Sequence, residues 1–115
     1  MRFIGVIALL VIGMSGANAQ VVGLGAKSCA QFAQEYLEAP EIAEPLYFTY
    51  AQGYMSALNI LMRALKNPIY DLAAWPVSRQ EASLRNFCDR NPSAEFVFAV
   101  QNLLEALPQI PPQSN

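Results

Sequence analysis

The chain has 115 residues, of which 54% are hydrophobic, and its nine acidic and seven basic residues give a net charge of −2 at pH 7. Without a basic stripe, this balance argues against nucleic acid or an anionic lipid surface as a partner. Histidine is absent, which removes the usual general base, the commonest transition-metal ligand and the ordinary sensor for pH 5–7. We therefore expect a protein that is not an enzyme and that carries no metal and no cofactor.

The first nineteen residues predict an export signal. Arg2 supplies the positive start, an apolar run follows from Ile4 to Ile12, and the triplet ending at Ala19 fits the small-x-small rule for signal peptidase. The apolar run is shorter than the roughly twenty residues that a permanent bilayer-spanning helix needs. We expect cleavage after Ala19 and a periplasmic location without a stable membrane anchor; the alternative is a retained anchor.

The two cysteines of the chain, Cys29 and Cys88, are predicted to form one disulfide, since an even cysteine count in an exported protein is typical of a stapled domain. The bridge would close a loop of about 60 residues and stabilise the fold by roughly 4 kcal/mol on the loop-entropy model. We divide the chain into a signal peptide (1–19), a flexible lead-in (20–27), a single helical domain (28–107) and a disordered tail (108–115).

The first helix is predicted to begin at the capping-box pair Ser28 and Gln31 and to end at Pro40. Pro45 is interpreted as the first-turn proline of a second helix that runs to about residue 66. Gly53 in mid-helix is unfavourable by about 1 kcal/mol relative to alanine, and we expect another helix to approach closely there. The predicted inner stripe of this helix consists of Leu46, Tyr50, Gly53 or Tyr54, Ala57, Leu61 and Leu65.

Residues 69–77 are interpreted as an apolar connector that packs back on the core. A third helix is predicted to begin at the capping box of Ser78 and Glu81, and Asn91-Pro92 is expected both to end it and to cap a fourth helix. Four amphipathic helices without an alternating strand pattern predict an all-α bundle with no sheet. The fourth helix has a strongly apolar face made of Phe96, Val97, Val100, Leu103, Leu104 and Leu107.

A disulfide between the first and third helices would leave the fourth helix unclamped. Any opening of the bundle would then release its apolar face, which makes those six residues the candidate surface for a client or partner. The glutamates at positions 35, 38, 41 and 44 have no basic neighbour in the sequence. They form either a solvated helix end or a patch that loses its charge below about pH 4–5.

Three motifs carry a resemblance to a known family: Ser28-Cys29-x-x-Phe32, then Gly53-Tyr54 with Asn59, and Phe87-Cys88-x-x-Asn91-Pro92. Together they resemble the HdeA/HdeB-like group of small exported bacterial proteins. The resemblance implies a helical fold held by one disulfide, with Cys29 and Cys88 at the matching positions. It also implies an acid-activated periplasmic chaperone, which partly unfolds at low pH and exposes apolar surface to unfolding clients.

The chain also resembles the Tai-type immunity proteins of type VI secretion, which share the export signal, the glycine-tyrosine motif and the junction before an apolar helix. Their additional cysteines have no counterpart here, where Tyr50 and Trp75 stand near the corresponding positions. That resemblance implies a preformed surface that binds a toxin. A structural periplasmic bundle of unassigned role is the third alternative. The first two imply a protein partner, unfolded clients or a toxin, and a homodimer is left open.

Overall fold

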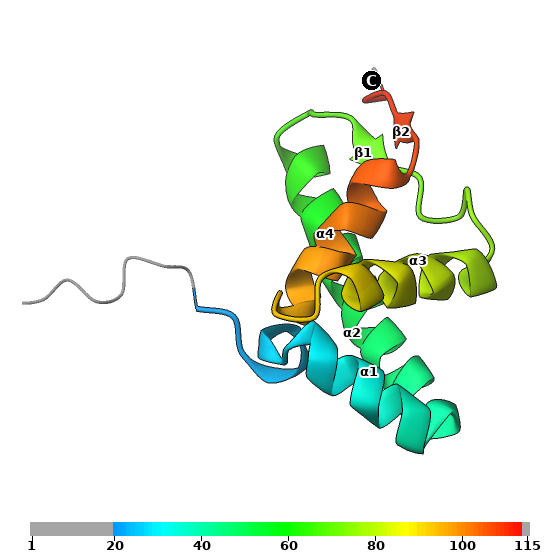
Figure 1. Cartoon of the computed structure of the whole chain (residues 1–115). Coiled ribbons are helices and arrows are strands. Elements are labelled where there is room, and N and C mark those ends of the chain that lie inside the picture. Colours follow the sequence, from blue (N-terminus) through cyan, green and yellow to red (C-terminus); the bar gives the residue numbers. More distant parts are fainter. Residues whose placement is uncertain (1–19, 114–115) are drawn as a thin grey trace, which may run out of the picture.

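The computed structural model describes residues 20–113, so the predicted signal peptide and the last two residues of the predicted tail lie outside the described part. In chain order the elements are η1 (Gly23–Ala26), α1 (Cys29–Glu38), α2 (Pro40–Ala64), β1 (Ile69–Tyr70), α3 (Val77–Arg90), α4 (Phe96–Ala106) and β2 (Gln109–Ile110) (Figure 1). Four helices and one disulfide confirm the predicted all-α bundle for this part of the chain.

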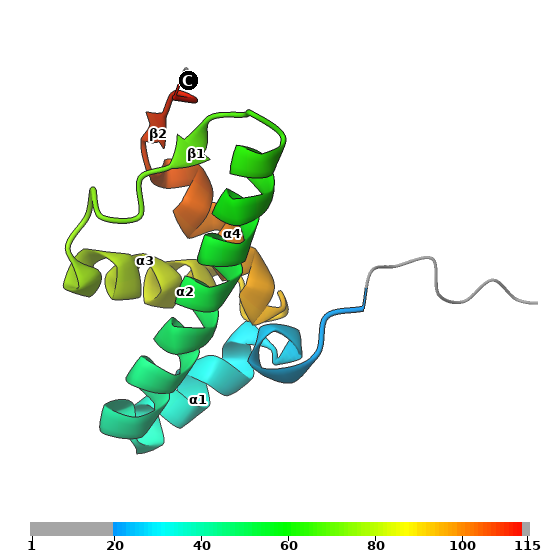
Figure 2. The ribbon, with the colours of Figure 1, turned by 180° about the vertical axis from the view of Figure 1, so that it is seen from behind.

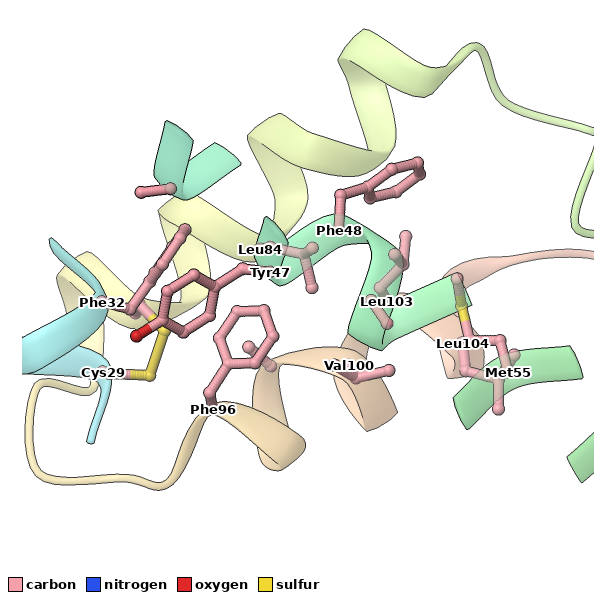
Figure 3. Packing of buried hydrophobic residues seen from close by; sticks show 14 of the residues in the cluster. Cys29, Phe32, Tyr47, Phe48, Met55, Leu84, Phe96, Val100, Leu103 and Leu104 are labelled. Carbon is pink, nitrogen blue, oxygen red and sulfur yellow. A yellow bond between two sulfur atoms is a disulfide. The ribbon is translucent and has the colours of Figure 1, made fainter. Parts of the chain in front are cut away.

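Helix α2 runs along the molecule and organises the other elements around it. Figure 2 shows it passing from the α1 end to the end where β1 and β2 pair. Helix α1 packs beside its first half, and α4 lies between α3 and the second half of α2 (Figures 1 and 2). The buried apolar side chains of all four helices meet in one cluster (Figure 3).

The start of α1 agrees with the prediction, whereas the start of α2 does not. The hydroxyl Oγ of Ser28 accepts a hydrogen bond from the backbone N–H of Gln31 at 3.1 Å, which caps α1. Helix α2 begins at Pro40, and Pro45 lies inside it. Pro45 is tolerated because it sits on the exposed side of the second turn, where its missing N–H leaves only a solvent-accessible carbonyl without a donor.

The inward face of α2 is different from the predicted stripe. The buried residues are Ala43, Tyr47, Phe48, Ala51 and Met55. Leu46, Leu61 and Leu65, which the prediction placed inside, are all more than half exposed. A Cβ built at Gly53 meets no atom within 4 Å, so no helix within the described chain approaches it closely. The prediction for Gly53 is therefore wrong within the described chain. The predicted stripe is correct for Tyr50 and Tyr54, which pack partly buried against the core, and wrong for the three leucines. The helix carries apolar residues on both faces, and periodicity alone did not select the buried one.

The boundaries of α3 and α4 also differ from the predicted ones. Helix α3 begins at Val77 after Pro76, so Ser78 lies inside the first turn and does not cap it. The side-chain amide of Asn91 donates to the carbonyl of Phe87 at 2.9 Å, which engages it at the end of α3 rather than at the start of α4. A turn then carries the chain to Glu95, the residue that precedes α4.

Residues 69–77 pack against the core as predicted, with Tyr70, Leu72 and Trp75 partly buried against it. The prediction of no sheet is wrong in one detail, because β1 and β2 form a small antiparallel pair with Ile69 opposite Ile110. The segment from residue 108, expected to be a disordered tail, therefore begins with a paired strand.

The lead-in, expected to be flexible, contains η1, and one of its glycines lies directly against the core. A Cβ at Gly25 would overlap the ring and hydroxyl of Tyr50. The backbone of Lys27 also accepts a hydrogen bond from the N–H of Phe96 at 2.8 Å. Residues 23–27 are therefore part of the packed domain.

Candidate functional site

The disulfide joins the first residue of α1 to the last turn of α3. The Cα atoms of Cys29 and Cys88 are 4.6 Å apart, 59 positions separate them in the sequence, and both side chains are buried. The described residues contain no free cysteine. The predicted staple between these two helices is confirmed, and neither sulfur in this part of the chain is available as a thiolate.

The start of α4 is fastened at the same place, which corrects the expectation of an unclamped fourth helix. The backbone N–H of Cys29 donates to the carbonyl of Ala94 at 2.7 Å, and that of Ala30 donates to the carbonyl of Pro92 at 2.9 Å. With the bond from Phe96 to Lys27, three backbone hydrogen bonds surround the disulfide. The turn before α4 and the first residue of α4 are therefore tied to the start of α1 and the residues before it, without a covalent link of their own.

Three aromatic rings pack against one another beside the disulfide, and Figure 3 shows them together. Ring centroids lie 4.6 Å apart for Phe32 and Tyr47, 4.9 Å for Tyr47 and Phe96, and 5.0 Å for Phe32 and Phe96. All three side chains are buried, and they come from α1, α2 and α4. We call these residues the aromatic triad. It is the point at which those three helices meet.

The carboxylate of Glu35 lies at the edge of this triad and accepts from three donors. These are the hydroxyl of Tyr47, the ammonium Nζ of Lys27 at 2.9 Å and the side-chain amide of Gln31 at 3.3 Å. The hydrogen bond from Tyr47 first, and that from Lys27 next, hold the pKa of Glu35 below its ordinary value of 4.5. Burial, and then the bond to Glu35, raise the pKa of Tyr47.

A second carboxylate of the acidic stretch is also paired across elements. Glu44 of α2 accepts from the guanidinium of Arg85 of α3, which also lies 5.1 Å from the ring centroid of Tyr36. Close by, burial, and then the charge of Glu44, raise the pKa of Glu81. The stretch has no basic neighbour in the sequence, but the fold supplies Lys27 to one glutamate and Arg85 to another.

The six apolar residues predicted as a client or partner surface lie in the core of the closed molecule. Their exposed fractions are between 0% and 3%: Phe96, Val97, Val100, Leu103, Leu104 and Leu107. The structure brings Phe96 into the aromatic triad, and the other five line the inner side of α4 or follow its end. They can meet a partner only after the bundle opens.

Sequence reasoning did not identify Tyr47, Lys27 or Arg85 as members of this site. Tyr47 stands 12 positions from Glu35, and Arg85 stands 41 positions from Glu44. No short-range pattern connects residues so far apart, so only the fold reveals their contacts. Asn59 was noted only as part of a motif; its side-chain amide donates to the carbonyl of Tyr70 and accepts from its N–H, at 2.8 and 2.9 Å.

One groove on the surface is lined by residues of this site. A groove of about 250 Å³ lies between α1 and α3 and is lined by Phe32, Ala33, Tyr36, Leu37, Arg85, Asn86 and Asp89. Within residues 20–113, no group of three or more His, Cys, Asp or Glu side chains could hold a metal ion. None of the helices described here is both long and apolar enough to cross a membrane.

A scan against protein-family models and searches of curated proteins and of solved structures found no match to this chain.

Proposed function

We propose that this protein is a small exported periplasmic chaperone that opens in acid, and that it has no catalytic activity. One observation carries the proposal: a single carboxylate, Glu35, accepts from Tyr47 and Lys27 at the point where η1, α1 and α2 meet. Tyr47 is also a member of the aromatic triad. Protonation of the Glu35 carboxylate therefore acts, through its hydrogen bond with Tyr47, on the packing of α1, α2 and α4 in the aromatic triad.

The lowered pKa of Glu35 gives the sign of the pH response. Because the folded protein holds this carboxyl below its ordinary value of 4.5, its contribution to stability is present above that value. This contribution is lost as the pH falls through the lowered pKa that Glu35 has in the folded protein. Glu81 acts in the opposite direction, since its pKa is raised in the fold and proton uptake there favours the folded state as the pH falls. The proposal requires the loss at Glu35 to outweigh this gain at Glu81.

Acid opening would separate α2 from α1 and α4 while the disulfide keeps α1 and α3 joined. The inner face of α4, beginning at Phe96, is then the apolar surface offered to an unfolding client. With the carboxylates protonated, the six basic residues that follow the predicted signal are no longer balanced. The resulting positive charge favours solubility of the open form. This is the behaviour that the resemblance to the HdeA/HdeB-like group implies.

The test is a titration from pH 7 to pH 2 followed by near-UV circular dichroism and by binding of a hydrophobic dye. We expect the near-UV signal to fall and dye binding to rise below about pH 4–5, and aggregation of an acid-labile client to decrease over the same range. Glu35→Gln should weaken the closed state at pH 7 and make the transition less steep. Glu38→Gln is the matched control, because Glu38 is exposed and, within the described residues, its side chain accepts a hydrogen bond only from Gln34 of its own helix.

A protein that keeps its near-UV signal and binds no dye down to pH 2 would contradict the proposal. Binding of a toxin through a preformed surface would then become the better interpretation, and a neighbouring gene for a secreted effector would support it. Equal effects of Glu35→Gln and Glu38→Gln would contradict the role given to Glu35 in the opening.

A further inference from the structure

The outer side of α3 carries a groove that the proposed acid response does not use. It has a volume of about 250 Å³ and is open to solvent. Six residues of α3 and of the segment before it line the groove: Trp75, Arg79, Ala82, Ser83, Asn86 and Arg90. We call this site the arginine groove. Among the described residues no acidic side chain lines it, although the whole chain has a net charge of −2.

Arg79 is held at one end of the arginine groove by stacking on Trp75. The guanidinium carbon of Arg79 lies 3.7 Å from the centroid of the Trp75 ring. A guanidinium that stacks on an aromatic face keeps the N–H groups at its edge free, and their fork matches the two oxygens of a carboxylate. Neither ion pair found within residues 20–113 uses Arg79. The stacked guanidinium is therefore positioned to receive an anionic group from outside the described chain.

The fold fixes Trp75 itself. The buried side-chain amide of Gln80 donates to the carbonyls of Leu72 and Trp75, at 2.9 and 2.8 Å. These two hydrogen bonds fasten the turn before α3 to the first turn of α3. Leu72 and Trp75 also pack partly buried against the core. The stacked pair of Trp75 and Arg79 is therefore part of the closed fold.

Arg90 places a second positive charge at the other end of the groove. Its Nε donates to the carbonyl of Asn86 at 3.2 Å, so the two terminal nitrogens of the guanidinium point the remaining donors toward a ligand. Ser83 and Asn86 lie between the arginines on the same side of α3, because positions 79, 83, 86 and 90 follow one another at helical spacing. The hydroxyl and the amide can each donate and accept hydrogen bonds. The groove therefore has two cationic ends and a neutral polar middle.

The spacing of the two arginines selects the ligand. Arg79 and Arg90 are about three turns, or about 16 Å, apart along the axis of α3, so one small anion cannot contact both. An extended peptide advances about 3.4 Å per residue, and its side chains at positions i and i+4 point to the same side, about 14 Å apart. Glutamates at those positions reach both arginines through their flexible side chains. The peptide groups between them then lie over Ser83 and Asn86.

Other classes of anionic partner fit the groove less well. A nucleic acid or a charged polysaccharide carries its charges more densely than the two arginines do, and an acidic protein repels the charges that extend beyond the groove. A lipid surface requires exposed apolar side chains that insert into it. Apart from Trp75, the side chains that line the groove are small or polar.

We propose that the arginine groove binds an extended acidic segment of a protein partner, through two carboxylate side chains four residues apart. The inference does not depend on the acid response, because the groove belongs to the closed bundle and the carboxylates of the partner are charged at neutral pH. The groove is also separate from the inner face of α4, which is buried in the closed molecule.

The first experiment is a titration of the purified exported protein at pH 7 with a capped peptide that has two glutamates four residues apart and serine or alanine elsewhere. Trp75 is the single tryptophan of the chain, so its fluorescence reports directly on the groove. We expect a saturable change in emission with a Kd below about 1 mM, since the peptide makes two charge-assisted contacts. A peptide with glutamine at both positions should bind at least about tenfold more weakly, and one with adjacent glutamates at least about threefold more weakly.

The variants Arg79→Gln and Arg90→Gln should each raise the Kd of the first peptide by at least about threefold. Arg63→Gln is the matched control, because Arg63 is an exposed arginine of α2 that belongs to neither ion pair found within residues 20–113. It should leave the Kd unchanged. Absence of saturable binding would overturn the proposal, and so would an equal weakening by Arg63→Gln. Binding of a heparin fragment or an anionic lipid vesicle as tight as that of the peptide would overturn the assignment to a protein segment.

The second experiment locates the bound peptide by NMR chemical shifts at pH 7. The side-chain amide of Asn86 and the Nε–H groups of Arg79 and Arg90 should shift most, and the near-UV circular dichroism should stay unchanged because the bundle remains closed. Shifts that centre on the inner face of α4, or loss of the near-UV signal, would overturn the proposal, since the peptide would then bind an opened form. A full acid response without peptide binding at pH 7 would refute this inference and leave the proposed function standing.

Discussion

The hydrogen bond from Tyr47 to Glu35 is predicted to stabilise the closed bundle at neutral pH by about 1–2 kcal/mol. A hydrogen bond to a charged group contributes roughly 1.5–3 kcal/mol. The Glu35 side chain is 33% exposed, so solvent screening moves the value to the lower part of that range. Tyr47→Phe removes the donor and keeps the ring, whose centroid lies 4.6 Å from that of Phe32 and 4.9 Å from that of Phe96. The free energy of unfolding lost in Tyr47→Phe therefore reports on the hydroxyl and not on the packing of the ring.

The assay is a double-mutant cycle of Tyr47→Phe and Glu35→Gln, measured by urea denaturation at pH 7 and at one fixed protein concentration. The cycle isolates the interaction between the two side chains from their separate effects on stability. We expect a coupling energy of about 1–2 kcal/mol. Carboxyl titration by NMR should also show the pKa of Glu35 moving upward in Tyr47→Phe, because the largest cause of its lowering is this hydrogen bond.

A coupling energy below about 0.3 kcal/mol, the usual scatter of additive sites, would refute the reasoning. A Glu35 titration that Tyr47→Phe leaves unchanged would refute it as well, because the carboxylate would then have no interaction with the hydroxyl to lose in acid.

Two further predictions concern the packing around this site. Phe96→Ala should destabilise the protein by about 3–5 kcal/mol, whereas Phe98→Ala, at a 48% exposed position of the same helix, should change stability by less than about 1 kcal/mol. Chemical denaturation of both variants checks this contrast. Similar losses of stability in the two variants would contradict the assigned orientation of α4. Asn59→Ala should cost about 1–3 kcal/mol because it removes both hydrogen bonds to Tyr70, and hydrogen exchange of the Tyr70 amide should accelerate. Gln52→Ala, at an exposed position of α2, is the control and should leave that exchange rate unaltered.

The sequence by itself determined three features: the buried face of the fourth helix, the cap at Ser28 and the pairing of the two cysteines. The six apolar residues of the fourth helix recur at helical spacing on one side only, and all of them are buried as the pattern indicated. The cap at Ser28 needs only a side chain and a backbone N–H three residues later, so it formed as predicted. The pairing of Cys29 with Cys88 had no competitor, because the chain has no third cysteine.

Tertiary structure decided which face of α2 is buried. Leu46 and Leu61 belong to a helical stripe as regular as that of Tyr47, Ala51 and Met55, so periodicity had two solutions. The choice depends on which stripe fits against α1 and α4, and the ring of Tyr47 completes a triad with partners from both helices. The helix starts at Ser78 and Asn91 were wrong for a related reason, since Pro76 and the turn after Asn91 set those boundaries within the packed fold.

Tertiary structure also decided what surrounds each charge and where the chain end lies. Gln31 donates to Glu35 from four residues away, but the other donors to Glu35 and Glu44 come from positions 8 to 41 residues away, a separation at which sequence patterns carry no directional information. Strands β1 and β2 have two residues each, too few to show alternation, and they pair where the chain leaves α2 and α4, two helices that pack against each other. Local sequence therefore specifies helices, caps and a disulfide, whereas the environment of an ionisable group is a property of segments that only the fold makes neighbours.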